Sequence, residues 1–316
     1  MWKYVLKRLV SLAFILLGLS FFVFAMTSML PSDPVQRLLA TMGAEQNPEV
    51  IAAMKAEFGL DEPFLVQYKN WMFGVLQGDL GQSVYYNESV NDVLARKLPN
   101  TIRLAVASFI LMVLISFPLA IFSAVYHKKW PDIIIRMLSF IGVSMPSFWV
   151  GLILINVLAV SMHWLPVSGS ETLSHLVMPS MTMAIGLSAL FIRRIRSAML
   201  EQMNKPYIIG LESRGVSRAR IIACHVLPNS LLTLVTLLGI SFGDLLGGTM
   251  IVETIFGWNG IGKTAIEAIT NRDYQLIQGY VLWVGTIYVV INLLVDISYK
   301  YLDPRIRLTG GVELDK

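Results

Sequence analysis

The chain has 316 residues, of which 55% are hydrophobic and 15% are charged; soluble domains carry roughly 25% charged residues, so this composition predicts a protein with several membrane spans. Its net charge of +4 is divided among short clusters between apolar stretches, which argues against a nucleic-acid partner and indicates membrane topology instead. The single cysteine, Cys224, excludes a disulfide within the chain and a cysteine-based metal site.

An apolar run at residues 9–30 follows the basic residues Lys3, Lys7 and Arg8. At about 22 residues it is longer than the apolar part of a signal peptide, and no small-residue cleavage pattern follows it. We therefore expect residues 1–30 to form a cytoplasmic N-terminus and an uncleaved first span.

Residues 31–100 have the composition of a soluble segment, with nine acidic and five basic residues. Helical spacing predicts one helix after a cap at Asn47 and a second helix that opens at Pro63. Because an acidic segment after a span with a cytoplasmic start belongs on the far side of the membrane, we expect an extracytoplasmic helical insert. At about 70 residues the insert is too small to be an independent enzyme domain.

Five further apolar stretches are each long enough to cross a bilayer. They lie near residues 101–126, 134–162, 176–192, 230–256 and 277–302. If the segments between them alternate in side, 17 of the 25 Lys and Arg residues fall in the cytoplasm, as the positive-inside rule requires. The sequence thus predicts an all-α membrane protein of six transmembrane helices with both termini in the cytoplasm. The transmembrane domain is expected over 101–308, and a cytoplasmic tail over 309–316.

Two acidic residues, Asp244 and Asp296, fall inside the predicted fifth and sixth spans. Charges at membrane depth are costly and usually face a partner or a water-filled path, although a local cap or pair also explains them. The glycines near Asp244 have near-helical spacing, which permits close helix packing against a second subunit. They are Gly239, Gly243, Gly247 and Gly248.

The segment from Gly257 to Thr264 fits the phosphate-loop pattern G-x-x-x-x-G-K-[ST]. That loop binds phosphate only between a strand and a helix of a soluble α/β domain. Here it follows a membrane span on the side away from ATP. We therefore interpret it as a glycine-rich turn that opens a short external helix.

His163 and His175 lie in one predicted external loop, with Met162 beside them. These side chains suit contact with a soft metal or a substrate, but a metal site needs three or four ligands, so no metal is assigned. The sequence contains no Ser/His/Asp or paired-carboxylate arrangement at a shared depth, and we expect no catalytic activity.

The predicted cytoplasmic loop 193–229 holds seven Lys and Arg residues against two acids. Two helical pieces, 198–209 and 217–226, are expected to meet in a sharp turn at Gly215, and Pro228 is expected to end the second piece. Such a loop is either a solvated topological element or a short helix that fits a groove on another protein.

The pattern Tyr207-x6-Arg214-Gly215-x11-Leu227-Pro228 resembles the coupling loop of binding-protein-dependent ABC importer permeases, although Leu211-Glu212-Ser213 stands where that family has small residues. Other motifs resemble the dipeptide, oligopeptide and nickel branch of these permeases. They are Gly59-Leu60-Asp61-x-Pro63, Gly78-Asp79-Leu80-Gly81, Ser144-Met145-Pro146-Ser147-Phe148-Trp149, Gly247-Gly248-Thr249-x-x-x-Glu253 and Leu302-Asp303-Pro304-Arg305.

The resemblance implies a non-enzymatic permease subunit in a bacterial inner membrane. It implies a second homologous permease, two cytoplasmic ATPases that use ATP, and an extracytoplasmic binding protein as partners. It implies no cofactor bound by this subunit itself. The substrate it implies is nickel or a nickel chelate, with di- or oligopeptides nearly as well supported. An ion-coupled secondary transporter that uses Asp244 and Asp296 is the alternative, although the repeated halves usual in such proteins are missing.

Three groups of site residues follow from these expectations. The ATPase-coupling residues are Tyr207, Glu212, Ser213, Arg214, Gly215, Leu227 and Pro228 of the coupling helix and its surroundings, between spans four and five. The translocation-pathway residues are Met145, Asp244 and Glu253. The possible substrate or metal contacts are Met162, His163 and His175.

Overall fold

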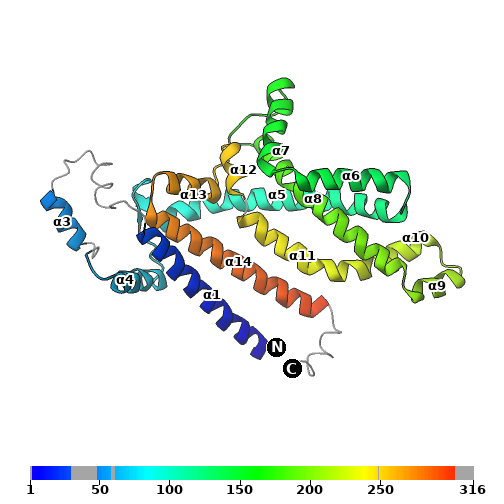
Figure 1. Ribbon diagram of the computed structural model, residues 1–316, viewed down its shortest axis with the longest axis horizontal. Helices are drawn as coiled ribbons and strands as arrows, with labels where there is room; N and C mark the ends of the chain where they lie inside the picture. Colours follow the sequence, from blue (N-terminus) through cyan, green and yellow to red (C-terminus); the bar gives the residue numbers. More distant parts are fainter. Residues whose placement is uncertain (1, 30–47, 58–60, 248, 303–316) are drawn as a thin grey trace. The chain divides into compact units, whose positions relative to one another are not determined.

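The computed structural model describes residues 2–29, 48–57, 61–247 and 249–302, and these are almost entirely helical (Figure 1). Four of the described helices are long and apolar enough to cross a membrane, and a fifth crossing exists if one bent pair of helices is counted as a single span. The prediction of a helical, multi-span membrane protein is therefore confirmed. The chain divides into two compact units, residues 1–101 with 259–289 and residues 102–258 with 290–316, which are described separately.

The first unit contains α1 (Trp2–Ser28), α3 (Pro48–Glu57) and α4 (Phe64–Leu76). Pro63 is the N-cap of α4, as its position predicted, whereas the expected cap at Asn47 lies outside the described residues. Aromatic side chains hold α4 against α1, since the Phe24 ring lies 5.2 to 5.5 Å from the rings of Phe64, Tyr68 and Trp71. These aromatic side chains of α4 are thus packed within the unit.

A small hairpin is the one departure from all-α structure among the described residues. Strands β1 (Gln82–Ser83) and β2 (Glu88–Ser89) pair antiparallel after a turn at residues 78–81, in which Gly78 and Gly81 have positive φ. Asp273 anchors the hairpin, because its carboxylate accepts hydrogen bonds from the Ser83 hydroxyl at 2.6 Å and from the Tyr85 backbone N–H at 3.0 Å. Local helical periodicity gives no sign of such two-residue strands.

Helix α13 (Ile261–Thr270) confirms the short helix predicted after the glycine-rich turn. It follows another helix, α12 (Met250–Ile255), so the strand that a phosphate loop requires is not present at this point of the described chain. The Ile261 N–H donates to the Thr101 hydroxyl at 2.9 Å. On the same helix Glu267 accepts a hydrogen bond from the hydroxyl of Tyr86, and burial together with that bond raises the pKa of Tyr86 and keeps it protonated.

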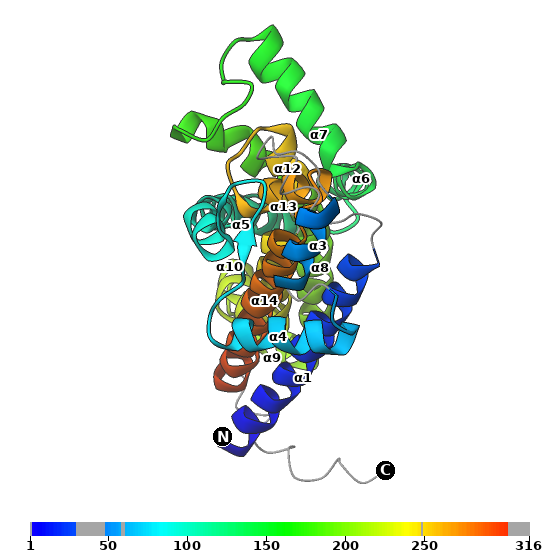
Figure 2. The same ribbon diagram turned by 90° about the vertical axis from the view of Figure 1, so that its left-hand side faces the viewer.

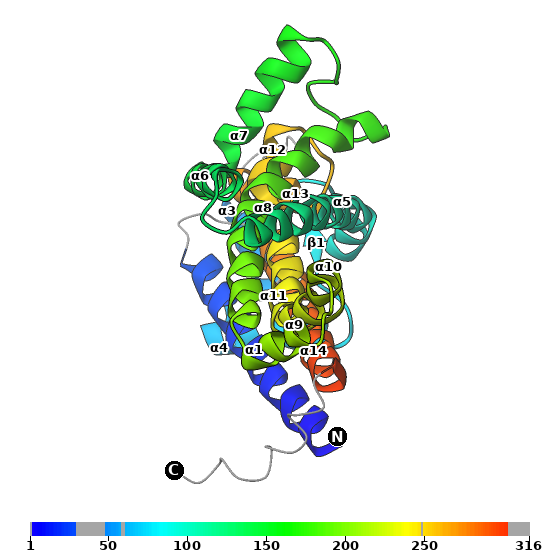
Figure 3. The same cartoon turned by 90° about the vertical axis from the view of Figure 1, so that its right-hand side faces the viewer.

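The second unit is built around α8 (Leu173–Met203), which contacts α6, α7, α11 and α12 (Figure 3). The other helices are α5 (Val90–Val125), α6 (Trp130–Ser144), α7 (Ser147–Leu154), η1 (Ile155–Ser161), α9 (Pro206–Ser213), α10 (Arg218–Ile221), η2 (Ile222–Val226), α11 (Leu227–Gly247), α12 and α14 (Tyr274–Leu302). Helices α5 and α14 begin in the first unit and end in the second.

The predicted span over 134–162 is not one continuous helix. Helix α6 ends at Ser144, and the following helix starts at Ser147 after a bend of 104° (Figures 1 and 2). Met145 is extended, with φ −86° and ψ 128°. Because the ring of Pro146 disfavours a helical conformation in the preceding residue and removes a backbone donor, the helix stops here.

The stretch 230–256 is also not one helix. Helix α11 ends at Gly247 after 21 residues, and α12 starts at Met250. At its other end α11 continues directly from η2, so Pro228 does not end the preceding helix as expected. The π-helical turn Ile222–Val226 widens the backbone before this proline, and the Asn229 side-chain amide donates to the His225 carbonyl at 2.7 Å.

One of the glycines near Asp244 packs within the chain. A Cβ atom on Gly239 would lie 2.0 Å from Cγ2 of Val295 on α14. The missing side chain therefore lets α11 and the end of α14 approach each other closely. Packing inside this subunit accounts for Gly239 without a second subunit.

Candidate functional site: the helix between α8 and α11

Helix α9 starts where α8 is interrupted. Helix α8 ends at Met203, Lys205 has extended backbone angles, and Pro206 occupies the first turn of α9 (Figure 3). Proline suits that position because the first N–H groups of a helix have no partner within the helix. The predicted helix 198–209 is thus two helices that are separated by a short turn.

The C-terminus of α9 is closed by the turn that Gly215 predicts. Gly215 has φ 74°, its N–H donates to the Glu212 carbonyl at 2.9 Å, and the Val216 N–H donates to the Leu211 carbonyl at 3.1 Å. These two bonds define a Schellman motif, in which a left-handed residue satisfies the last carbonyls of a helix. The turn redirects the chain into α10.

One side of α9 is anchored in the core of the second unit. Ile208 is only 5% exposed and lies in one apolar cluster with Ile195, Met199, Ile221 and Val226. The partly buried side chains that pack against this cluster include Leu211, Val216 and Leu227. The position of α9 is therefore determined by α8, α10 and η2, and burial of this apolar surface stabilises it.

The opposite side of α9 faces outward. Ile209 is 66% exposed although its neighbour Ile208 is buried. Five of the predicted coupling residues are exposed on this side or on the turn after it: Tyr207, Glu212, Ser213, Arg214 and Gly215. Of the other two, Leu227 packs beneath α9 and Pro228 is exposed on the first turn of α11. The outward side of α9 and the turn after it thus present one apolar side chain, Ile209, and two charged side chains, Glu212 and Arg214.

The predicted pathway residues occupy different elements. Met145 is half-buried at the α6–α7 break, and Glu253 is completely buried in α12, which contacts α7 and α8. Asp244 belongs to α11, but its side chain, like that of Asp296 in α14, lies outside the described part. Glu253 and Met145 therefore both lie on elements next to a break in an apolar helix.

The predicted substrate or metal contacts lie on the loop before α8 and in the first turn of that helix. Met162 and His163 are exposed, and His163 has a positive φ of 55°. His175 instead takes part in the N-terminal cap of α8, because its Nδ1 atom lies 3.3 Å from the Thr172 backbone nitrogen. Within the described residues, no three His, Cys, Asp or Glu side chains form a group that could hold a metal ion.

The cap of α8 also includes Glu171. Hydrogen bonds from its own backbone N–H and from that of Ser170 hold its pKa below the ordinary value, and His175 lowers it further. The Nε2 atom of His175 lies 3.4 Å from this carboxylate. The cap provides a local structural explanation for His175.

Sequence reasoning missed a buried ion pair, Asp132 with Arg196. Asp132 is fully buried at the start of α6, and its two carboxylate oxygens accept hydrogen bonds from Nε and NH2 of Arg196, both at 2.7 Å. The same carboxylate accepts from the Ser123 hydroxyl at 2.6 Å and from the Lys128 N–H at 3.0 Å. Arg196 also contacts Nδ1 of His127 at 2.9 Å. Arg196 was counted only as a topological charge, and no local pattern pairs it with Asp132.

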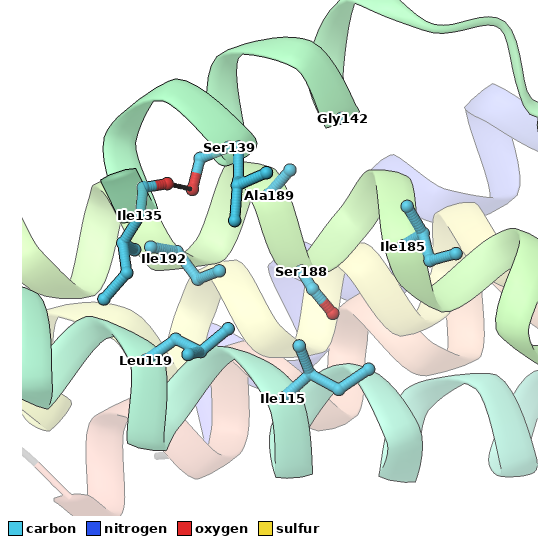
Figure 4. Close-up of a pocket in the computed structure, with 10 residues that line it drawn as sticks. Ile115, Leu119, Ile135, Ser139, Gly142, Ile185, Ser188, Ala189 and Ile192 are labelled. Atoms are coloured by element: carbon cyan, nitrogen blue, oxygen red, sulfur yellow. Dashed lines mark hydrogen bonds between the residues drawn. The ribbon is translucent and has the colours of Figure 1, made fainter. Parts of the chain in front are cut away.

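An apolar cavity of about 140 Å³ lies between α5, α6 and α8 (Figure 4). Its walls come from Ile115 and Leu119 on α5, from Ile135 and Ser139 on α6, and from Ser188 and Ile192 on α8. The Ser139 hydroxyl donates to the Ile135 carbonyl within its own helix. The cavity walls therefore offer mainly apolar surface.

Two family models match this chain. The model for the binding-protein-dependent transport system inner membrane component matches residues 116–308, and the model for the N-terminal part of such membrane components matches residues 1–105. Together they cover both the insert and the region that contains α9.

Curated relatives match along nearly the whole length. The glutathione transport system permease protein GsiC of Salmonella choleraesuis (strain SC-B67) is 35% identical over 307 residues, which are 97% of this chain and 99% of the relative. The protein of the same name from Escherichia coli (strain K12) is 34% identical over the same shares.

Solved structures share the fold at low identity. A chain of the MetNI methionine ABC transporter, in an inward-facing conformation, aligns with a TM-score of 0.56 at 15% identity and covers 67% of this chain and 96% of its own. A chain of an amino acid ABC transporter with histidines aligns with a TM-score of 0.52 at 18% identity, covering 68% of this chain and 94% of its own.

Proposed function

Because the chain belongs to the family of binding-protein-dependent transport system inner membrane components, we propose that it is the permease subunit of an importer for peptide-like substrates. Members of this family are non-catalytic, multi-pass permeases of ABC importers in the inner membrane. Separate ATPases hydrolyse ATP, and a binding protein delivers the substrate. The nickel substrate favoured by motif resemblance is less well supported, because the curated relatives described above, which match 97% of this chain, are glutathione permeases.

The outward side of α9 is the proposed contact with an ATPase. A short helix that presents an exposed Ile209 while Ile208 anchors it fits the recognition of a helix by a groove. Closure of two ATPases on ATP would push α9, and α8 would carry that displacement into the membrane. The ion-coupled alternative with Asp244 and Asp296 gains no support from the comparisons.

The remaining topology belongs to the same proposal. A second homologous permease completes the pathway, the insert over 31–100 contacts the binding protein, and both termini lie in the cytoplasm. The support for this orientation is the concentration of Lys and Arg in the segments that it places inside. This subunit binds no cofactor of its own.

The substrate is tested with the binding protein that works with this permease. We expect calorimetry to show tight binding of glutathione or short peptides and weak binding of free nickel. Proteoliposomes with both permeases and both ATPases should then take up the bound compound only with internal ATP and the loaded binding protein. Uptake driven by an ion gradient without ATPases would overturn the proposal, and tight nickel binding without peptide binding would restore nickel as the substrate.

The ATPase contact is tested by two neighbouring isoleucines. Ile209→Ala should leave permease stability unchanged and weaken co-purification of the ATPases, since its side chain is exposed. Ile208→Ala should instead lower the unfolding free energy by about 2–5 kcal/mol, because it removes a buried side chain. Normal ATPase binding by Ile209→Ala and by Ile209→Asp would exclude this face as the contact.

A further inference from the structure

The Asp132–Arg196 pair joins α6 to α8 at the end of α8 that leads into α9. Arg196 lies seven residues before the last residue of α8, and two residues then separate α8 from α9. Its side chain is 14% exposed and Asp132 is fully buried, so water does not replace their hydrogen bonds. A guanidinium that binds both oxygens of one carboxylate fixes orientation as well as distance. The pair therefore determines the angle at which α6 lies on α8.

A second contact joins the same helices further along. A Cβ atom on Gly142 of α6 would lie 2.9 Å from Cβ of Ala189 on α8, so the backbones are closely packed there. Ten residues separate Asp132 from Gly142, which is about 15 Å along a helix at a rise of about 1.5 Å per residue. The apolar cavity of about 140 Å³ borders this second contact, because Gly142 and Ala189 are among the residues that line it. The ion pair and this close approach therefore join α6 to α8 at two separate points within a broader contact between the two helices.

The α6–α8 pair connects α9, the proposed ATPase contact, with the bend between α6 and α7. At one end α8 continues into α9. At the other end α6 stops at Met145–Pro146, where the chain bends by 104°. A displacement of α9 reaches the α6 side of the bend if α6 follows α8, whereas α7 on the other side contacts α8 directly.

We propose that Asp132 and Arg196 are positioning residues for transport, because they make α6 follow α8 when α9 is displaced. This inference rests on the proposed ATPase contact of α9. A buried ion pair stabilises a protein little more than apolar residues of similar size, so stability alone gives no reason to keep it. The two hydrogen bonds between Asp132 and Arg196 fix the orientation of α6 relative to α8, which apolar packing alone does not do.

The first test replaces the planar group and keeps its charge. Arg196→Lys, in the full complex, should give normal membrane levels and normal basal ATPase activity, with ATP-dependent uptake lowered at least about five-fold, the lower end of typical coupling effects. Arg194→Lys is the matched control, because Arg194 is exposed on the same helix. If Arg196→Lys does not assemble, Asp132→Asn combined with Arg196→Gln, which leaves no unpaired charge, enters the same assay.

The second test replaces the ion pair by a covalent bond. Gly142→Cys and Ala189→Cys are introduced together with Cys224→Ser, and Cβ atoms this close suit a disulfide after a small adjustment. Oxidation of the Arg196→Lys complex should restore uptake, and a reducing agent should remove it again. A residue needed only for folding would not respond to oxidation of the folded complex.

Two results would overturn the inference. In one, the Arg196→Lys complex takes up substrate as well as the Arg194→Lys complex. This comparison tests the inference even if the disulfide does not form. In the other, the disulfide stops uptake in the complex that retains Arg196, which would mean that α6 slides on α8. Failure of the proposed function differs from both, because the unmodified complex would then show no ATP-dependent uptake.

Discussion

Gly215 occupies a conformation that other residues adopt only at a cost. Its φ of 74° is required by the two hydrogen bonds that close α9, and a Cβ atom at this position would meet nothing within 4 Å. The left-handed region costs an ordinary residue roughly 1–2 kcal/mol, but Asn and Asp enter it more readily. A side chain at this position therefore has room, and its effect on the turn depends on the residue type.

Gly215→Asp and Gly215→Asn form a matched pair for testing this turn. Both side chains tolerate the left-handed conformation, and they differ in charge. We expect both variants to insert normally, and Gly215→Asp to abolish stimulation of ATPase activity by the loaded binding protein because it adds a negative charge to the contact surface. Gly215→Asn should retain part of the stimulation. Full stimulation in Gly215→Asp would remove the turn from the ATPase contact.

Breaks in apolar helices are the main feature at the scale of elements. Pro146 ends α6, whereas Pro118 in α5 and Pro179 in α8 lie within continuous helices. A proline therefore does not break a helix by itself; at this break the residue before it, Met145, is extended. The break places a bend of 104° directly after the close contact at Gly142.

Pro146→Ala should weaken this bend. Alanine restores a backbone N–H and lets Met145 become helical, so α6 and α7 can join. We expect a longer mean distance between spin labels at the exposed positions Met137 and Leu152, and lower ATP-dependent uptake. Pro118→Ala is the control and should change neither measurement. An unchanged label distance in Pro146→Ala would show that tertiary packing alone maintains the bend.

The distribution of charge is the feature that acts on the molecule as a whole. The predicted cytoplasmic segments hold 17 of the 25 Lys and Arg residues, and the loop around α9 holds seven of them. Cys224, the single cysteine of the chain, is exposed in this loop. It therefore serves as a natural reporter of which membrane face the loop occupies.

A membrane-impermeant maleimide tests the orientation. Cys224 should react in inside-out vesicles and remain unmodified in intact spheroplasts. In a Cys224→Ser background, a cysteine at the exposed position Glu171 should show the opposite pattern, since the loop before α8 is expected outside. Labelling of Cys224 from the outer face would reverse the topology and place α9 away from any cytoplasmic ATPase.

Local signals in the sequence predicted local structure well. Pro63 marked the start of α4, Gly215 marked the turn after α9, and the glycine-rich segment before Ile261 marked α13. The break between α11 and α12 was missed, because apolar residues continue through it and hydropathy carries no information about the direction of the backbone. The Asp132–Arg196 pair was missed because 64 residues separate its members, and such pairing is a property of the tertiary fold.

Asp132 receives four hydrogen bonds, from Ser123, Lys128 and twice from Arg196. Replacing either member of the ion pair alone would leave a buried charge without its partner, at a cost of about 3–5 kcal/mol. A lineage that changes this site therefore has to cross an unfavourable single-substitution intermediate or change both residues together. Among related permeases we expect the acid and the guanidinium to be inherited or lost as a unit, even where α9 itself diverges.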